Sequence, residues 1–206
     1  MMKRKLAAAQ LVLAGALLTA VAVPIGNPVQ AQIKPVIVNK TDGQWIQDAK
    51  GWWYKYTDGS YPRNKWDQIN GKYYYFNVHG YLLTGWQQLK GFGDYKETSW
   101  YYFDPTNGDM QTGWQNINGK WYYLDPAEGY MLTGVQQVGK NNECYYFHPT
   151  NGDMQTGWYK LPGTLGHPEP AWFYFDPADG SMATGWKQID GKWYQFDSLE
   201  GFLMTE

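Results

Sequence analysis

The sequence predicts an all-β chain, a solenoid in which β-hairpin repeats stack on one another. Its 206 residues include 12 Trp, 18 Tyr and 8 Phe, and every one of these aromatic residues follows position 44. A motif returns along the same stretch, as GDMQTGW at 108–114 and again at 152–158. Two-residue turn signals such as Asn118-Gly119 separate short aromatic runs. Self-similar units that contain hairpin turns indicate a repeat architecture.

Composition excludes several other classes of protein. Lys and Arg total 17 against 19 Asp and Glu, so we expect no nucleic-acid partner, because nucleic-acid-binding domains are strongly basic. The aromatic content of 18% excludes long disorder. Branched aliphatic residues are sparse after position 46, which excludes an ordinary aliphatic core.

The first 31 residues have the features of a secretory signal peptide. A cationic start, MMKRK, precedes an apolar run over 6–25 and the small-residue site Val29-Gln30-Ala31, so we expect cleavage after Ala31. The alternative is an uncleaved anchor, because a run of about 20 residues can span a bilayer. We expect residues 1–31 to be removed, 32–44 to form a linker and 45–206 to carry seven repeats. The cleaved protein should have no stable membrane insertion.

The seven units each begin with a lead residue and contain a second aromatic block. The lead residues are Trp45, Trp66, Trp86, Trp114, Val135, Trp158 and Trp186. The second blocks begin, in our alignment, at Trp53, Tyr73, Trp100, Trp121, Cys144, Trp172 and Trp193.

Each unit is expected to form one hairpin. The second blocks are short aromatic runs bounded by Gly, Asn, Asp and Pro, which is typical of strands. The large length changes fall between the two blocks, from INGK at 117–120 to LPGTLGHPEPA at 161–171, as expected of an exposed hairpin tip. The nearly constant segment, such as DPTNGDMQTG at 104–113, should link successive hairpins. A lone hairpin is marginal in water, so stacked neighbours must supply the core.

The repeats resemble a known family. The pattern GWxxxxGKWYYxxxxxGxMxTGW, present from Gly113 through Val135 and again over 185–204, is similar to the choline-binding, or cell-wall-binding, repeats of Gram-positive surface proteins and autolysins. The resemblance covers 45–206 and implies a superhelical stack of hairpins. It also implies that the choline of teichoic acids binds between consecutive hairpins, in a secreted, cell-wall-associated protein.

The resemblance further implies where the ligand lies. In the family, two aromatic residues of one hairpin and one of the next enclose choline, and Met or Leu forms the floor. Ring faces attract a quaternary ammonium by about 0.5–2 kcal/mol each. The third ring should share a face with the lead residue, because side chains alternate along a strand. The expected ligand-binding residues are, box by box, Trp45, Trp53 and Tyr75; Trp66, Tyr73 and Tyr102; Trp86, Trp100 and Tyr123; Trp114, Trp121 and Tyr146; and Trp158 and Trp172, with Met110, Met131 and Met154 as floors.

Some units depart from this pattern. Val135 and Cys144 replace both Trp residues of the fifth unit, so no ligand is expected there. Gln195 stands where the seventh unit would supply a third ring. Tyr73 in place of Trp should weaken the second site without removing it.

Other aromatic residues are expected to serve packing alone, among them Tyr54, Tyr74, Tyr101 and Tyr122. The Asp residues that follow the strands, such as Asp104, suit turn capping better than calcium binding, which needs more oxygen ligands. No arrangement of His, Cys or carboxylates has the spacing of a zinc site or a catalytic triad. We therefore expect a binding module without a cofactor or an enzymatic activity.

Two alternative functions remain open at this point. Similar repeats in glucansucrases and clostridial toxins bind α-glucan or other glycans, and aromatic platforms also stack on sugar faces. The second alternative is an adhesin that contacts a host protein through long hairpin tips such as 161–171.

Overall fold

The computed structural model describes residues 42–139, 141, 143–163 and 167–205, which belong to one compact unit, Val38–Glu206. The expected signal peptide, 1–31, and residues 32–41 of the expected linker lie outside the described residues. None of the described residues belongs to a helix long and apolar enough to cross a membrane.

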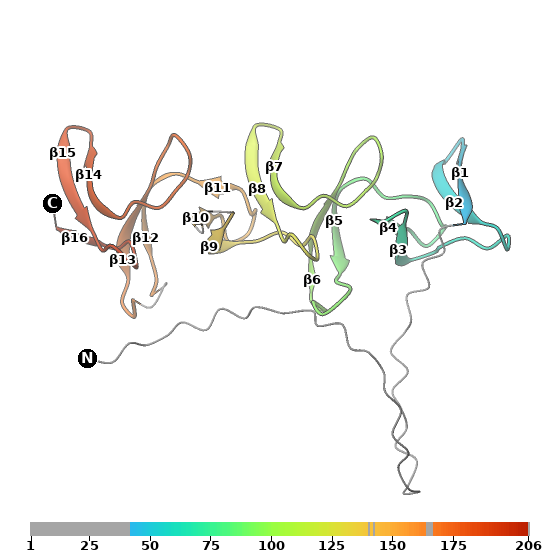
Figure 1. Ribbon diagram of the computed structural model, residues 1–206, viewed down its shortest axis with the longest axis horizontal. Coiled ribbons are helices and arrows are strands. Elements are labelled where there is room, and N and C mark those ends of the chain that lie inside the picture. Colours follow the sequence, from blue (N-terminus) through green and yellow to red (C-terminus); the bar gives the residue numbers. More distant parts are fainter. Residues whose placement is uncertain (1–41, 140, 142, 164–166, 206) are drawn as a thin grey trace, which may run out of the picture. The chain divides into compact units, whose positions relative to one another are not determined.

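The described residues form seven antiparallel hairpins, which follow one another in chain order (Figure 1). This arrangement confirms the predicted all-β solenoid of hairpins. We number the hairpins 1 to 7: β1 (Gly43–Asp48) with β2 (Gly51–Tyr56), β3 (Lys65–Ile69) with β4 (Lys72–Phe76), β5 (Gly85–Lys90) with β6 (Thr98–Phe103), β7 (Gly113–Ile117) with β8 (Lys120–Leu124), β9 (Gly134–Val138) with β10 (Glu143–Phe147), β12 (Gly157–Leu161) with β13 (Ala171–Phe175), and β14 (Gly185–Ile189) with β15 (Lys192–Phe196).

A third segment pairs with most hairpins. The short strands β11 (Met154–Gln155) and β16 (Leu203–Thr205) pair with β10 and β15. After hairpins 2, 3, 4 and 6 an isolated bridge takes this place, as between Leu124 and Met131. The segment after each of hairpins 2 to 7 therefore turns back along the hairpin that precedes it.

The tight hairpin turns have the expected backbone conformation. Asn118 and Gly119 have φ of 52° and 79°, and Asp190 and Gly191 have φ of 49° and 83°. Two consecutive residues with positive φ match the right-handed twist of the flanking strands. These dipeptides therefore set the register of their hairpins.

The hairpins stack front to back. We call the face that carries the lead residue the front, and the opposite face the back. Trp114, on the front of hairpin 4, lies 4.8 Å from Tyr145 and 5.7 Å from Phe147, ring centroid to centroid, both on the back of hairpin 5. Phe147 is fully buried. The core is thus a series of aromatic interfaces between neighbouring hairpins, as a repeat protein requires.

The linkers stack on one another as well. The backbone N–H of Met131, after hairpin 4, donates to the carbonyl of Trp100 in hairpin 3 at 2.8 Å. Its side chain covers Gly152 of the next linker, where an added Cβ would lie 2.3 Å from the sulfur of Met131. Since Gly152 also has a φ of +73°, only glycine fits there without strain.

The Asp residues that follow the strands cap turns, as predicted. The Asp104 carboxylate accepts the backbone N–H groups of Thr106 and Asn107, each at 2.8 Å. These hydrogen bonds lower the pKa of Asp104. Asp125, Asp176 and Asp197 accept backbone N–H groups in the same way.

Candidate ligand-binding site

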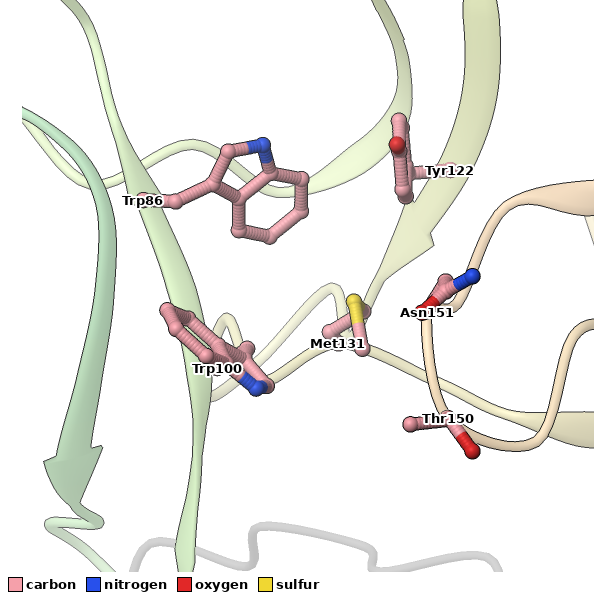
Figure 2. A pocket seen from close by; sticks show the side chains of 6 residues that line it. All are labelled: Trp86, Trp100, Tyr122, Met131, Thr150 and Asn151. Carbon is pink, nitrogen blue, oxygen red and sulfur yellow. The ribbon is translucent and has the colours of Figure 1, made fainter.

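A cavity of about 380 Å³ lies between hairpins 3 and 4. Trp86 and Trp100 of hairpin 3 and Tyr122 of hairpin 4 surround it, with Met131 from the following linker between them (Figure 2). The rings of Trp86 and Tyr122 are 4.9 Å apart and steeply inclined, at 62°. We call such a set an aromatic box: two rings of one hairpin, one ring of the next, and a Met or Leu side chain.

Strand pairing places the two Trp rings on one face. Trp86 lies opposite Tyr102, and Trp100 lies opposite Gln88, two residues further along each strand. Because side chains alternate between faces, positions two apart point the same way. Trp100 remains 39% exposed, so its ring is accessible from solvent.

The outer wall of the cavity comes from a more distant linker. Thr150 and Asn151, between hairpins 5 and 6, face the three rings across the cavity (Figure 2). In the cavity between hairpins 1 and 2, Thr106 and Asn107 take the corresponding place. The box is therefore complete only when two further linkers are stacked in register.

Three other junctions carry the same arrangement. Cavities of about 660 Å³ and 490 Å³ lie at junctions 1/2 and 4/5. At junction 6/7 the lead ring lies 6.5 Å from the second Trp and 5.0 Å from the tyrosine of the next hairpin. The boxes are Trp45, Trp52, Tyr74 and Leu82; Trp114, Trp121, Tyr145 and Met154; and Trp158, Trp172, Tyr194 and Leu203.

The electrostatic surroundings of the boxes differ. Lys72 lines the cavity at junction 1/2, where its ammonium group pairs with Asp109 at 2.8 Å. The hydrogen bond to Asp109 raises the pKa of Lys72. At junction 4/5 the carboxylate-bearing Asp179 lines the cavity instead. A bound cation would thus lie near the Lys72–Asp109 ion pair at junction 1/2 and near the Asp179 carboxylate at junction 4/5.

The third ring at junction 4/5 is well buried. Tyr145 is 8% exposed, and its hydroxyl donates to Glu143 at 2.9 Å. Burial, with that hydrogen bond, raises the pKa of Tyr145 to about 12. Its ring is therefore neutral at physiological pH and presents an uncharged aromatic face.

Junction 2/3 has the rings of a box, but another side chain lies among them. Phe92, from the long tip of hairpin 3, has its ring centroid 4.6 Å from Trp66 and 4.6 Å from Tyr73. Tyr101 supplies the third ring, 4.8 Å from Trp66. The N–H of Met110 donates to the Tyr73 carbonyl at 2.8 Å, so this floor residue is also in place.

Junction 5/6 has no comparable set of rings. Tyr146 stacks on Phe175 of hairpin 6 at 5.6 Å, and Val135 packs into the same cluster. Burial raises the pKa of the Cys144 thiol.

Within the described residues, no three His, Cys, Asp or Glu side chains gather as metal ligands would.

A family model described as the choline-binding repeat matches residues 63–112, 111–159 and 167–206. The chain belongs to the choline-binding repeat family. The resemblance noted in the repeats is thereby confirmed over most of the chain.

Solved structures agree with this assignment. Choline binding protein F from Streptococcus pneumoniae is 36% identical, with a TM-score of 0.64 over 78% of this chain and 51% of that protein. CbpJ from Streptococcus pneumoniae is 34% identical, with a TM-score of 0.60 over 77% of this chain and 47% of that protein. By sequence, the lysozyme of Streptococcus phage Cp-1 is 56% identical over 32 residues, which are 16% of this chain and 9% of that lysozyme. The choline-binding repeats described here thus span about half the length of these solved structures.

The structure brings together most of the rings expected from the sequence. Trp86 and Trp100, with Met131, lie at junction 3/4, and Trp114 and Trp121, with Met154, lie at junction 4/5. Trp45 lies at junction 1/2, and Trp158 and Trp172 lie at junction 6/7.

The expected third rings lie on the other face of their hairpins. Tyr75, Tyr102 and Tyr123 each lie against the lead Trp of their own hairpin, at 5.4, 5.0 and 5.1 Å. Tyr146 faces hairpin 6. Because the hairpins stack front to back, the ring that meets a front must come from the next hairpin's back. The residue one position earlier in the strand supplies it, which gives Tyr74, Tyr101, Tyr122 and Tyr145. Tyr74 and Tyr122 line cavities, so the expectation that they serve packing alone is wrong.

The second ring of the first box is Trp52 and not Trp53, which was expected there. Trp52, opposite Gln47, shares the face of Trp45 and lines the cavity with it. Trp53 points to the other face and lies 5.6 Å from Tyr61. The sequence contains a signal for this position. Trp52 follows the lead residue Trp45 by seven residues, which is the interval between the lead residue and the second block in units two and four.

The seventh unit also supplies a ring. Tyr194 lies 5.0 Å from Trp158 on the back of hairpin 7, whereas Gln195 lies opposite Trp186 on the front. The expectation that Gln195 removes the third ring of this box is therefore wrong. The reason is the same as for the other third rings: the ring comes from the back of the next hairpin, and Gln195 lies on the front.

Sequence reasoning missed the wall residues and the inserted ring. Thr150 and Asn151 belong to the recurring PTNG segment, whose composition predicts only a turn. Nothing in a hairpin pattern brings residues two linkers away into a box. Phe92 lies in a tip insertion without periodicity, so only the fold shows where it points.

Proposed function

We propose that this chain attaches noncovalently to choline-bearing polymer of the bacterial cell wall. The observation that carries the proposal is the box at junction 3/4, where Trp86, Trp100 and Tyr122 present aromatic rings around one cavity. A quaternary ammonium has no N–H to donate, so ring faces and a polarisable thioether suit it better than hydrogen-bond acceptors do. The names of the relatives, choline binding protein F among them, support the same ligand.

The inclination of the rings favours a cation over a sugar. Trp114 and Trp121 meet at 86°, and Trp114 and Tyr145 meet at 74°. Rings at such angles form walls around a compact group, whereas a pyranose stacks on a flat platform. Glycan binding is therefore the second outcome that the experiment below must separate.

The repetition of boxes would convert weak sites into firm attachment. A single site of this kind should bind free choline at about the millimolar level, near −4 kcal/mol. Several sites on one array that face a polymer raise the avidity by roughly 10²–10⁴. We propose on this basis that the chain acts by binding alone, and that the expected signal peptide delivers it to the cell surface.

The test is a titration of the protein with choline chloride and, separately, with a linear α-glucan oligosaccharide, by isothermal calorimetry. We expect millimolar binding of choline and none of the oligosaccharide. The protein should also stay on a choline-derivatised resin in high salt and elute with free choline, because short-range contacts are little screened. Binding of the α-glucan alone would overturn the proposal in favour of a glycan ligand.

A matched pair of variants locates the effect. Trp100→Ala removes a ring from the box and should lose one choline equivalent. Trp186→Ala removes an equally large ring that is 60% exposed and lines none of the cavities described above. It should leave choline binding unchanged. Equal losses in both variants would show that the binding does not depend on the box.

A further inference from the structure

The tip of hairpin 3 inserts a ring into the box at junction 2/3. Phe92 lies 4.6 Å from both Trp66 and Tyr73, between the two rings that hairpin 2 contributes. It is tilted by 43° and 37° to them. The ring occupies the position that a ligand would need in order to contact both side chains.

The linker after hairpin 4 holds the tip in place. The Glu128 carboxylate, in the linker after hairpin 4, accepts the backbone N–H groups of Asp94 at 2.9 Å and Tyr95 at 2.8 Å. The ring of Tyr95 stacks on Tyr130 with 4.0 Å between centroids and 14° between planes. These contacts hold the segment that carries Phe92 against a different linker.

A further bond ties the box itself to the tip. The indole N–H of Trp66 donates to the carbonyl of Lys90 at 2.9 Å. Tyr101, the third ring, is fully buried beneath the tip, and its hydroxyl has no hydrogen-bond partner. Burial raises the pKa of Tyr101 far above that of an ordinary phenol. The tip and the rings of the junction are therefore in direct contact.

The other boxes differ in the exposure of the second ring. Trp52, Trp100, Trp121 and Trp172 are 41%, 39%, 44% and 45% exposed. Tyr73, at the same position of hairpin 2, is only partly exposed because Phe92 covers it. The second ring is therefore less exposed in this box than in the other four.

We propose that Phe92 is a permanent intramolecular occupant of the box at junction 2/3, so that this box takes no quaternary ammonium while the other four do. The inference rests on the proposed function and deepens it, because it states which junctions bind. It also assigns Trp66, Tyr73 and Met110 to a junction that is held together without ligand.

The physical reason is competition between a tethered ring and a free ligand. Phe92 is presented at the high effective concentration of a short tether. To bind, choline would have to displace the Phe92 ring into water and break the contacts of the tip with Glu128 and Tyr130. A ligand that binds a comparable box at about the millimolar level does not gain enough to do this.

The experiment counts choline equivalents by equilibrium dialysis. Phe92→Ala should bind one more equivalent than the wild-type protein. Phe92→Leu, which keeps a large apolar occupant, should bind the wild-type number. Adding Tyr73→Ala to Phe92→Ala should remove the extra equivalent and so assign it to this junction. An unchanged count in a folded Phe92→Ala protein would overturn the inference.

A second measurement uses the wild-type protein and needs no variant to fold. The indole N–H of Trp66 should keep its protection from hydrogen exchange when choline saturates the other boxes, because its bond to Lys90 persists. Loss of this protection on addition of choline would show that the ligand displaces the tip, which overturns the inference. If the wild-type protein binds no choline at all, the proposed function is wrong, whether or not Phe92 keeps its contacts.

Discussion

Trp114 lies 4.8 Å from Tyr145 of the next hairpin and 5.1 Å from Tyr123 of its own, ring centroid to centroid. The lead Trp therefore has two aromatic neighbours with different tasks. Tyr123 buttresses it within the hairpin, and Tyr145 closes the cavity from across the junction. The two classes of Tyr occupy adjacent positions in β4, β6, β8 and β10, so neighbouring substitutions should have different effects.

The first prediction compares a substitution in each of these two classes of Tyr. Tyr122→Leu removes the third ring of the box of Trp86 and Trp100 and should weaken choline binding there about tenfold, since one ring contact contributes about 0.5–2 kcal/mol. Tyr123→Leu leaves that box intact. The measurement is the choline-induced shift of the Trp86 indole N–H signal in NMR spectra. A normal titration of Trp86 in the Tyr122→Leu protein would contradict the assignment.

The second prediction concerns the contact between linkers. Gly152 and Gly134 both have a φ of +73°, but an added Cβ meets Met131 at Gly152 and nothing within 4 Å at Gly134. Gly134→Ala should cost about 1–2 kcal/mol from the backbone conformation alone. Gly152→Ala should cost about 1–3 kcal/mol more, because it overpacks the interior.

Urea unfolding would measure both variants. Gly152→Ala should in addition weaken choline binding at junction 3/4, because Met131 lines that cavity. Equal free energies of unfolding for the two variants would mean that Met131 moves aside without cost.

The third prediction concerns alkaline pH. The pKa of Tyr145 is raised to about 12 by burial, against about 10 in an unfolded chain. Between these values the unfolded state loses the proton before the folded state does. This contribution to stability is therefore complete below about pH 10 and is lost as the pH rises toward 12.

Tyr145→Phe keeps the ring and removes the ionisable group. The free energy of unfolding, followed from pH 9 to 12, should fall less steeply in this variant than in the wild-type protein. Identical slopes would show that the Tyr145 hydroxyl ionises freely in the folded state.

The fourth prediction builds a box at junction 5/6. Val135→Trp together with Cys144→Trp restores both rings of hairpin 5, and Phe173 holds the back-face position that Tyr145 holds in the preceding junction. The variant should bind one more choline equivalent. It should also lose about 1–3 kcal/mol of stability, because Tyr146 must leave Phe175 to admit the new ring.

The control for this box is a third substitution. Phe173→Leu, added to the double variant, should remove the new equivalent in equilibrium dialysis. If the triple variant binds as many equivalents as the double variant, the added ligand lies elsewhere.

The sequence by itself determined the hairpins and their order. Dipeptides such as Asn118-Gly119 fix a two-residue turn through local backbone preference, and the aromatic alternation fixes the two faces of each strand. Both signals act over a few residues, so they can be recognised without the rest of the fold. The lead Trp residues and the floor residues Met131 and Met154 follow from the same local repeat.

The tertiary structure decided what each face meets. Whether Tyr122 or Tyr123 closes a box depends on whether hairpins stack front to back, and the alternation of a single strand fits either arrangement. The position of Phe92 depends on the contacts of its tip with Glu128 and Tyr130, more than 30 residues away. Local preference specifies which residues share a face, whereas only the packing of neighbouring units specifies which faces come together, because that choice minimises exposed aromatic surface over the whole array.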